Sequence, residues 1–282
     1  MSDNRAHTTV GFIGLGSQGG PMARRIVAAG YPTLLWARRP EALAPFADTE
    51  AVAAPSVTDL GARCDHVGVC VVDDAGTQQI CAGLIAAMRP GSRIAIHSTV
   101  HPDTCRALAG EAASHGIGLV DAPVSGGGPA AAAGTLTVMV GGDAATVAAA
   151  RPIFESFAGL IVHLGDVGAG QAAKLINNSL MAAHMALAHD ALAAGVSLGL
   201  DRAALISLIK ASSGRSFGFE VYARLPNPSA FAHGAKLLDK DVRLLGELLG
   251  EHASFAPFGN LARPFLASLL LPQPPTAAST PE

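Results

Sequence analysis

Two polar side chains, Lys174 and Asn178, lie four residues apart in a segment that is otherwise rich in Ala, Leu and Ile. An α-helix turns about 100° per residue, so these two positions share one face. An ammonium group among apolar neighbours is costly to desolvate, which lowers the pKa of a lysine towards neutrality and suits it to proton transfer. Lys174 is therefore a candidate general acid/base, and Asn178 a candidate partner that orients it. The alternative is a surface lysine near the start of a helix.

A glycine-rich turn near the N-terminus supplies a second kind of chemistry. Its six residues are Gly14, Leu15, Gly16, Ser17, Gln18 and Gly19, in the pattern G-x-G-x-x-G. The turn follows a short apolar segment and precedes a predicted helix, the context in which this pattern indicates a dinucleotide site. Gly14 permits the tight turn, Gly16 lets the backbone approach a pyrophosphate, and Gly19 lets the helix pack closely on the strand. The helix N-terminus favours the anion. The alternative is a glycine-rich turn that binds nothing.

The end of the next predicted strand bears on which dinucleotide binds. NAD sites usually present a carboxylate there to the ribose 2′-hydroxyl. This sequence instead has Arg38 and Arg39, and no carboxylate before Glu41. Two guanidinium groups suit a 2′-phosphate, which they can bind bidentately. The sequence therefore favours NADP, with NAD as the alternative.

The elements that must position these residues alternate between strands and helices up to residue 165. Strands are expected at 10–14, 33–36, 67–72, 93–96, 118–121, 136–140 and 161–164. Helices are expected at 21–30, 40–47, 77–88, 103–115 and 143–157. This alternation predicts an α/β fold with a doubly wound, mostly parallel sheet of the Rossmann type, covered on both faces.

The pattern changes after residue 165, where no convincing strand follows. Helices are expected at 171–200, 202–211, 234–250 and 261–270. We therefore expect a dinucleotide-binding Rossmann domain over residues 1–165 and an all-α domain over 166–282. Residues 272–282 are Pro-rich and are expected to form a disordered tail. Lys174 falls near the domain junction, and clefts between domains are common ligand sites.

The composition excludes several classes of protein. Of 282 residues, 50% are hydrophobic and 15% charged, so the chain can bury a large core. A net charge of −3 with 5% aromatic residues gives no case for nucleic acid or an anionic membrane as a partner. Uninterrupted apolar runs of about 18 residues are lacking, so no membrane span is expected. The four cysteines have no metal-ligand spacing; we expect no metal site, and reduced thiols in a cytoplasmic protein.

Four sequence blocks, in order, resemble the β-hydroxyacid dehydrogenase family, which includes 3-hydroxyisobutyrate dehydrogenase and tartronate semialdehyde reductase. They are the cofactor turn at 11–23, the segment Asp121-Ala-Pro-Val-Ser-Gly-Gly127, the segment Gly168–Asn178, and the pair Lys240-Asp241. One departure concerns the cofactor: Ala37 replaces the Asn or Asp usual in the family, so the choice between NADP and NAD stays open. Gln18 and Ala130 also depart from the family pattern, whereas Lys174 does not.

The resemblance implies roles for further residues. Ser125, Gly126 and Gly127 would hold the substrate carboxylate through hydroxyl and backbone N–H donors, which a glycine run after a strand leaves exposed. The alternative for this segment is a plain flexible loop. The other residues implied by the resemblance concern the cofactor: Thr99 would lie beside the nicotinamide ribose, Val72, Asp73 and Thr77 would line the cofactor path, and Lys240 would close over the cofactor with support from Asp241.

The activity that the resemblance implies is hydride transfer between a nicotinamide and a short 3-hydroxy acid or its semialdehyde. Lys174 would be the general acid/base of that reaction, with Asn178 as its partner. The all-α domain would bind substrate and form subunit contacts, in a homodimer or homotetramer. Two alternatives remain at this stage: an imine reductase on the same scaffold, and a non-catalytic NADP-binding protein.

Overall fold

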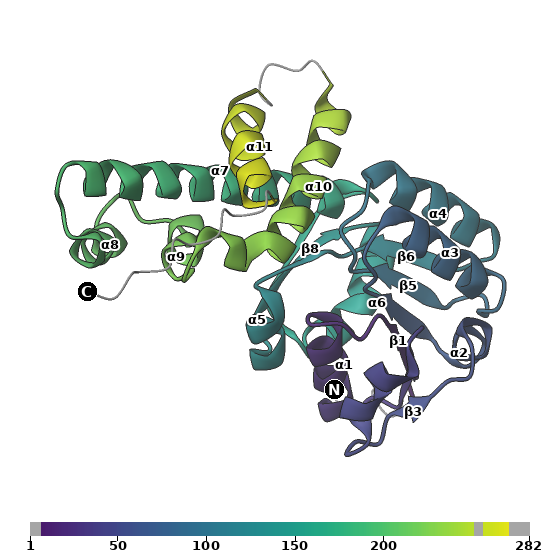
Figure 1. Cartoon of the computed structure of the whole chain (residues 1–282). Helices are drawn as coiled ribbons and strands as arrows, with labels where there is room; N and C mark the ends of the chain where they lie inside the picture. Colours follow the sequence, from purple (N-terminus) through teal and green to yellow (C-terminus); the bar gives the residue numbers. More distant parts are fainter. Residues whose placement is uncertain (1–6, 251–255, 271–282) are drawn as a thin grey trace. The chain divides into compact units, whose positions relative to one another are not determined.

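The computed structural model describes residues 7–250 and 256–270. It divides the chain into two compact units, Met1–Lys174 and Leu175–Glu282. The first unit contains the whole sheet, and the second is helical (Figure 1). The expected α/β class, with a Rossmann-type sheet followed by helices, is therefore confirmed.

The sheet of the first unit has the strand order β3-β2-β1-β4-β5-β6-β8-β7, and β9 also pairs with β8. Its strands are β1 (Val10–Ile13), β2 (Thr33–Trp36), β3 (Val52–Ala53), β4 (His66–Val69), β5 (Arg93–Ile96), β6 (Gly118–Asp121), β7 (Val124–Ser125), β8 (Leu136–Gly141) and β9 (Ala158–Gly165). Strands β1 to β6 are parallel, whereas β8 runs antiparallel to β6 and β7. The chain order reverses between β1 and β4, which is where open α/β sheets bind ligands at the carboxyl ends of their strands.

Two cores cover the two faces of this sheet because successive side chains of a strand point to opposite sides. Phe12 of β1 packs on one face with α1 (Gly19–Ala28), α5 (Gly127–Ala133) and α6 (Ala144–Phe154). Ile13 packs on the other face with α2 (Val57–Arg63), α3 (Asp74–Ile85) and α4 (Pro102–Ser114). The carboxyl edge of the sheet is thus left to the loops that follow the strands.

Several elements of this unit differ from the expectations. The structure adds β3, α2, β7 and α5, and the segment at 40–47 is a 3-10 helix, η1 (Pro40–Phe46). The strand expected at 67–72 ends at Val69, because the Val71 amide donates to Ser98 Oγ at 2.8 Å and leaves the sheet ladder. All four cysteines are free thiols, and burial raises the pKa of Cys81 to about 12.

The second unit consists of helices around their own core. They are α7 (Ala169–Ser197), which begins in the first unit, α8 (Arg202–Ala211), α9 (Phe217–Ala223), the 3-10 helix η2 (Pro228–Phe231), α10 (Ala232–Leu249) and α11 (Ala256–Leu270). Met185 and Leu192 of α7 pack with Tyr222, Val242 and Phe265. Helix α9 is not among the expected helices; Ser216 caps it by accepting from the Phe219 amide. None of the described helices combines enough length and apolar character to cross a membrane.

The division at residue 165 into a dinucleotide-binding domain and an all-α domain for substrate and subunit contacts stays a prediction. By packing, residues 166–174 group with the sheet, because the first turn of α7 is bonded to it. The predicted disordered tail at 272–282 lies outside the described residues.

Candidate active site

The cofactor turn joins β1 to α1, and its glycines meet different surroundings. Gly14 has φ +98°, and a Cβ there would overlap the carbonyl of Cys70, just after β4. A Cβ on Gly19 would overlap the carbonyl of Gly14. At Gly16, by contrast, no atom of the described residues lies within 4 Å of a Cβ position. Gly14 and Gly19 are thus required by the fold, whereas Gly16 faces open space.

The start of α1 suits an anion. Helix N-termini carry unpaired N–H groups and a partial positive charge. Within the described residues no side chain caps this one, and its first turn contains no acidic residue. The space at Gly16 and the uncapped helix start therefore fit the pyrophosphate of a dinucleotide. The contacts of Leu15, Ser17 and Gln18 with a cofactor stay predictions.

Arg38 and Arg39 lie two and three residues after the end of β2 and are both exposed. Arg39 occupies the position before η1, whose first turn contains Glu41. The carboxyl end of β2 therefore presents two guanidinium groups at the edge of the sheet that also carries the cofactor turn. This placement is compatible with a 2′-phosphate, and their role in binding one stays a prediction.

The residues after β4 divide into one exposed apolar side chain and two that hold a helix. Val72 is 68% exposed, which is unusual for a valine beside a sheet. Asp73 caps α3, its Oδ1 accepting from the Gly76 amide at 2.8 Å. Thr77 is fully buried, and its hydroxyl donates to the carbonyl of Asp73 at 2.8 Å. Asp73 and Thr77 thus shape this segment, and Val72 is the apolar side chain that it leaves exposed. Contacts of these three residues with a cofactor stay predictions.

The segment at 125–128, predicted to hold the substrate carboxylate, forms the end of β7 and the start of α5. Gly126 and Gly127 have φ +128° and +71°, values that other residues rarely adopt. Glycines with such backbone angles let a strand turn directly into a helix, so the alternative of a plain flexible loop does not describe this segment. Its role in holding a carboxylate stays a prediction. Ser125 is half-buried, whereas Gly126 and Gly127 are exposed. A Cβ on Gly128 would lie 2.6 Å from the carbonyl oxygen of Ser17, so this segment lies against the cofactor turn.

Thr99 lies in the loop between β5 and α4, and this loop is bonded to the first turn of α7. Gln171 donates through Nε2 to the carbonyl of Ser98 at 2.8 Å, and its Oε1 accepts from the Val100 amide at 3.1 Å. The two bonds flank Thr99. The start of α7 is therefore joined to the carboxyl end of β5.

Asp121, the last residue of β6, holds the start of α7 from another side. Its two carboxylate oxygens accept from the amides of Gly168 and Gln171, each at 2.7 Å. Burial raises the pKa of this carboxyl above 3.8, against these hydrogen bonds, which favour the charged form. The first turn of α7 is thus fixed to both β5 and β6, and Lys174 follows one turn later.

Lys174 and Asn178 are both buried, at 9% and 8% exposure, on one face of α7. Asn178 donates through Nδ2 to Asp241 Oδ2 at 2.6 Å, and Asp241 Oδ1 lies 3.0 Å from Lys240 Nζ. Asn177 donates to Asn178 Oδ1 at 3.1 Å. The amide of Asn178 is therefore held in one orientation, and Lys240 forms an ion pair with Asp241. The role of Lys240 at the cofactor, implied by the resemblance, stays a prediction.

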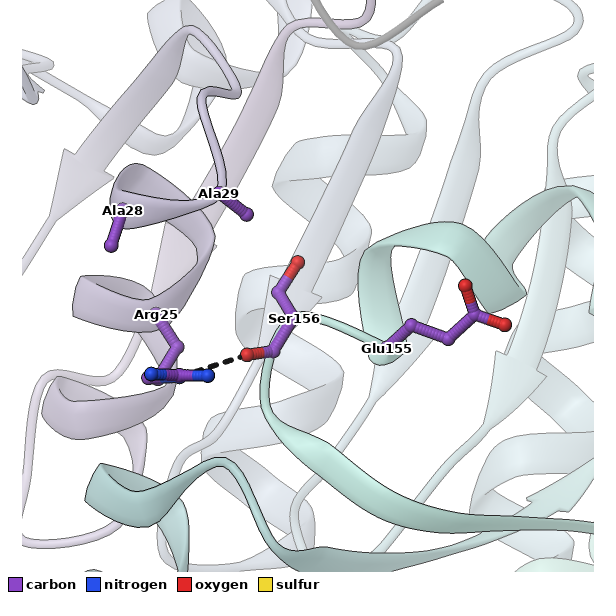
Figure 2. Close-up of a pocket in the computed structure, with 5 residues that line it drawn as sticks. All are labelled: Arg25, Ala28, Ala29, Glu155 and Ser156. Carbon is purple, nitrogen blue, oxygen red and sulfur yellow. Dashed lines mark hydrogen bonds between the residues drawn. The ribbon is translucent and has the colours of Figure 1, made fainter. Parts of the chain in front are cut away.

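A surface pocket of about 230 Å³ lies elsewhere in the first unit (Figure 2). It is lined by Arg25, Ala28 and Ala29 of the α1 region and by Glu155 and Ser156 after α6. Arg25 donates through Nε to the Ser156 carbonyl at 3.0 Å, as the dashed line in Figure 2 shows. None of the predicted site residues lines this pocket. We interpret it as the space around a structural arginine.

Comparison with known proteins places this geometry in a family. Residues 9–165 match the NAD binding domain of 6-phosphogluconate dehydrogenase, and residues 168–273 match the NAD-binding domain of NADP-dependent 3-hydroxyisobutyrate dehydrogenase. The NAD-dependent L-serine dehydrogenase of Pseudomonas aeruginosa is 38% identical over 90% of this chain and 89% of its own. The 3-hydroxyisobutyrate dehydrogenase of the same organism is 36% identical over 91% and 90%.

A solved structure gives the same result. The 3-hydroxyisobutyrate dehydrogenase of Mycobacterium tuberculosis with L-serine superposes with a TM-score of 0.81, at 32% identity, and the match covers 93% of each chain. The chain belongs to the β-hydroxyacid dehydrogenase family. Both family matches are nicotinamide dinucleotide-binding domains, so the cofactor class of this β-hydroxyacid dehydrogenase is NAD(P).

Two residues of this β-hydroxyacid dehydrogenase were not singled out by the sequence as site residues: Gln171, and Asp121, which entered only as part of a motif. Gln171 lies in the first turn of α7 and Asp121 ends β6, and their hydrogen bonds join this helix to the sheet. The sequence marks Gln171 only as a polar residue one helical turn before Lys174. Its partners are 71 and 73 positions away, and spacing alone cannot reveal them.

Proposed function

We propose that this protein oxidises a short 3-hydroxy acid, or reduces the corresponding semialdehyde, with Lys174 as the general acid/base. The observation that carries the proposal is the attachment of the Lys174 helix to the sheet edge that carries the cofactor turn. Gln171 and Asp121 make that attachment, at β5 and β6. A buried amine held at the edge where a dinucleotide would lie suits proton transfer next to hydride transfer.

The chain's own groups bind the acid and move its proton. When bound, NAD(P) takes up or supplies the hydride. The hydroxyl of Ser125 and the amides of Gly126 and Gly127 hold the substrate carboxylate. Lys174 Nζ takes the hydroxyl proton as the carbinol carbon is oxidised and returns a proton to the carbonyl oxygen in the reverse direction. Asn178, held by Asp241, orients the lysine or the substrate.

The names of the relatives support the substrate class. L-Serine and 3-hydroxyisobutyrate share a primary hydroxyl on the carbon β to a carboxylate. A site with one carboxylate-binding segment and one general acid/base suits any small acid that carries a hydroxyl at this position. We therefore assign the class of substrate and leave its side group open.

A panel of acids and imines tests this function. Purified protein is assayed with NADP and NAD on 3-hydroxyisobutyrate, L-serine and L-threonate, on isobutanol as a control without a carboxylate, and on cyclic imines in the reductive direction. We expect turnover of at least one acid and none of isobutanol. Turnover restricted to imines would contradict the proposal in favour of imine reduction, and cofactor binding without any turnover would favour a non-catalytic protein.

We propose NADP as the preferred cofactor, on the basis of Arg38 and Arg39. Both are exposed at the carboxyl end of β2, the position from which a ribose 2′-substituent is usually read. The relatives do not decide between the two dinucleotides, since one is named NAD-dependent and one matching domain is named for an NADP-dependent enzyme.

Assembly and compartment are further proposals. Large apolar side chains are exposed on α7, α8 and the turn between them: Leu187, Val196, Leu198, Leu200 and Leu208. Covering such a face supports a homodimer or homotetramer, which light scattering at low protein concentration tests. The four free thiols support the cytoplasm as the compartment.

A further inference from the structure

We infer that Gln171 is a positioning residue for the reaction: its side-chain amide fixes Lys174 relative to the loop that carries Thr99. The inference rests on the proposed role of Lys174 as general acid/base. It adds a second residue, Gln171, which joins the Lys174 helix to the loop after β5. Gln171 is fully buried, and both polar atoms of its side chain are bonded to the backbone of one loop.

The two hydrogen bonds act on either side of a single residue. Nε2 donates to the Ser98 carbonyl and Oε1 accepts from the Val100 amide, so the side chain pairs with the loop as a peptide group would. Thr99 between them cannot shift along α7 without breaking one bond. Ser98 is held in turn by the Val71 amide, which donates to its hydroxyl. The loop is therefore fixed to both α7 and the segment after β4.

Helix initiation does not account for this side chain. Asp121 already accepts from the backbone N–H groups of Gly168 and Gln171. The first turn of α7 is therefore capped without help from the side chain of Gln171. An apolar residue of the same size would fill the buried space, but it would leave the Ser98 carbonyl and the Val100 amide of two buried residues without these partners. The specific consequence of a glutamine here is the fixed relation between α7 and the Thr99 loop.

Helix geometry transmits this relation to Lys174. Three residues correspond to about 300° of turn, so Gln171 and Lys174 lie about 60° apart on neighbouring turns of one face. A tilt or rotation of the first turn of α7 therefore moves the amine directly. Hydride and proton transfer depend on such distances, and a misplacement of about 1 Å costs about 100-fold in rate.

The test replaces Gln171 with methionine, which keeps its length and removes both hydrogen bonds. Gln171→Met should lower kcat about 100-fold, with the dissociation constant of the cofactor and the substrate KM unchanged. The matched control is Thr33→Val, which removes another buried hydrogen bond, from the Thr33 hydroxyl to the Tyr31 carbonyl at 2.7 Å, at the amino end of β2. Thr33→Val should lower Tm and leave the kcat of the folded protein unchanged.

A second readout keeps this inference separate from the proposed function. The rate at which Lys174 is acylated by a water-soluble amine reagent, followed by peptide mapping, reports the placement of its buried amine without any turnover. We expect Gln171→Met to raise that rate and Thr33→Val to leave it unchanged. Absence of hydroxy-acid turnover in the wild type would defeat the proposed function, and the acylation rates would still decide the inference. Unchanged acylation in Gln171→Met, or a loss of kcat no greater than in Thr33→Val, would overturn it.

Discussion

Substitution of Gly16 by alanine separates cofactor binding from folding. No described atom lies within 4 Å of a Cβ at this position, and its φ is not in the positive range that excludes alanine. The new methyl group therefore meets nothing in the folded chain. If the cofactor pyrophosphate lies against this backbone, the methyl group meets the pyrophosphate instead.

Gly16→Ala should leave the folded protein as stable or more stable, and it should weaken cofactor binding. Alanine restricts the unfolded chain, so the free energy of unfolding should stay the same or rise by about 0.4–1 kcal/mol. Displacing the pyrophosphate should cost at least one charge-assisted N–H hydrogen bond, worth about 1.5–3 kcal/mol. At about 1.4 kcal/mol per tenfold, the Kd for the cofactor should rise about 10- to 150-fold.

Nicotinamide fluorescence titration gives the Kd, and thermal unfolding of the apo protein gives Tm. Gly110→Ala is the matched control, because Gly110 is an exposed glycine of α4 that also meets nothing within 4 Å among the described residues. It should raise Tm and leave the Kd unchanged. An unchanged Kd in a stable Gly16→Ala protein would refute the placement of the pyrophosphate at this turn.

Two further predictions concern charge. Arg38→Ala or Arg39→Ala should raise KM for NADP about 10- to 150-fold, because charge-assisted hydrogen bonds to the 2′-phosphate are lost. The KM for NAD, which has no 2′-phosphate, should be unchanged. Equal effects on both cofactors, or a wild type that prefers NAD, would contradict the NADP assignment. Burial raises the pKa of Asp121 above 3.8 in the folded chain, so its contribution to stability is fully present below pH 3.8 and is lost as pH rises through the raised value. Urea denaturation gives the free energy of unfolding of the wild type minus that of Asp121→Asn. This difference should fall as pH rises from 3.8 through the raised pKa. A difference that grows with pH would contradict a raised pKa of Asp121.

The sequence predicted those elements whose limits have local causes. β2, β5, β6 and α8 have the predicted bounds. Helix α8, for example, begins after Asp201, whose side chain accepts from the Ala204 amide. Apolar runs bounded by Gly, Pro or a capping residue specify such elements without help from the rest of the chain.

The elements that the sequence missed depend on tertiary structure or on glycine geometry. β3 has only two residues, Val52 and Ala53, which is too short for an alternating or continuous apolar pattern to mark it. α2 is a seven-residue helix that contains Gly61, where the lack of a side chain allows contact with Leu84 and Met88. α5 begins with glycines that resemble a loop. In each case the sheet or a neighbouring helix decides the structure.

The candidate site shows the same division. The spacing of the glycines and of Lys174 and Asn178 is local and could be predicted. The bonds of Gln171 and Asp121 join positions about 50 to 70 residues apart. They exist because β5 and β6 are neighbours in the sheet, a relation that the linear pattern does not specify.

Chemical rescue of a Lys174 variant tests the central claim most directly. If Lys174 transfers the proton, Lys174→Ala should lower kcat about 10²- to 10⁴-fold with an unchanged Kd for the cofactor, and small alkylamines added to the assay should restore part of the rate. Lys174→Ala that keeps full turnover of the hydroxy acid, or whose lost rate no amine restores while the cofactor no longer binds, would contradict the account.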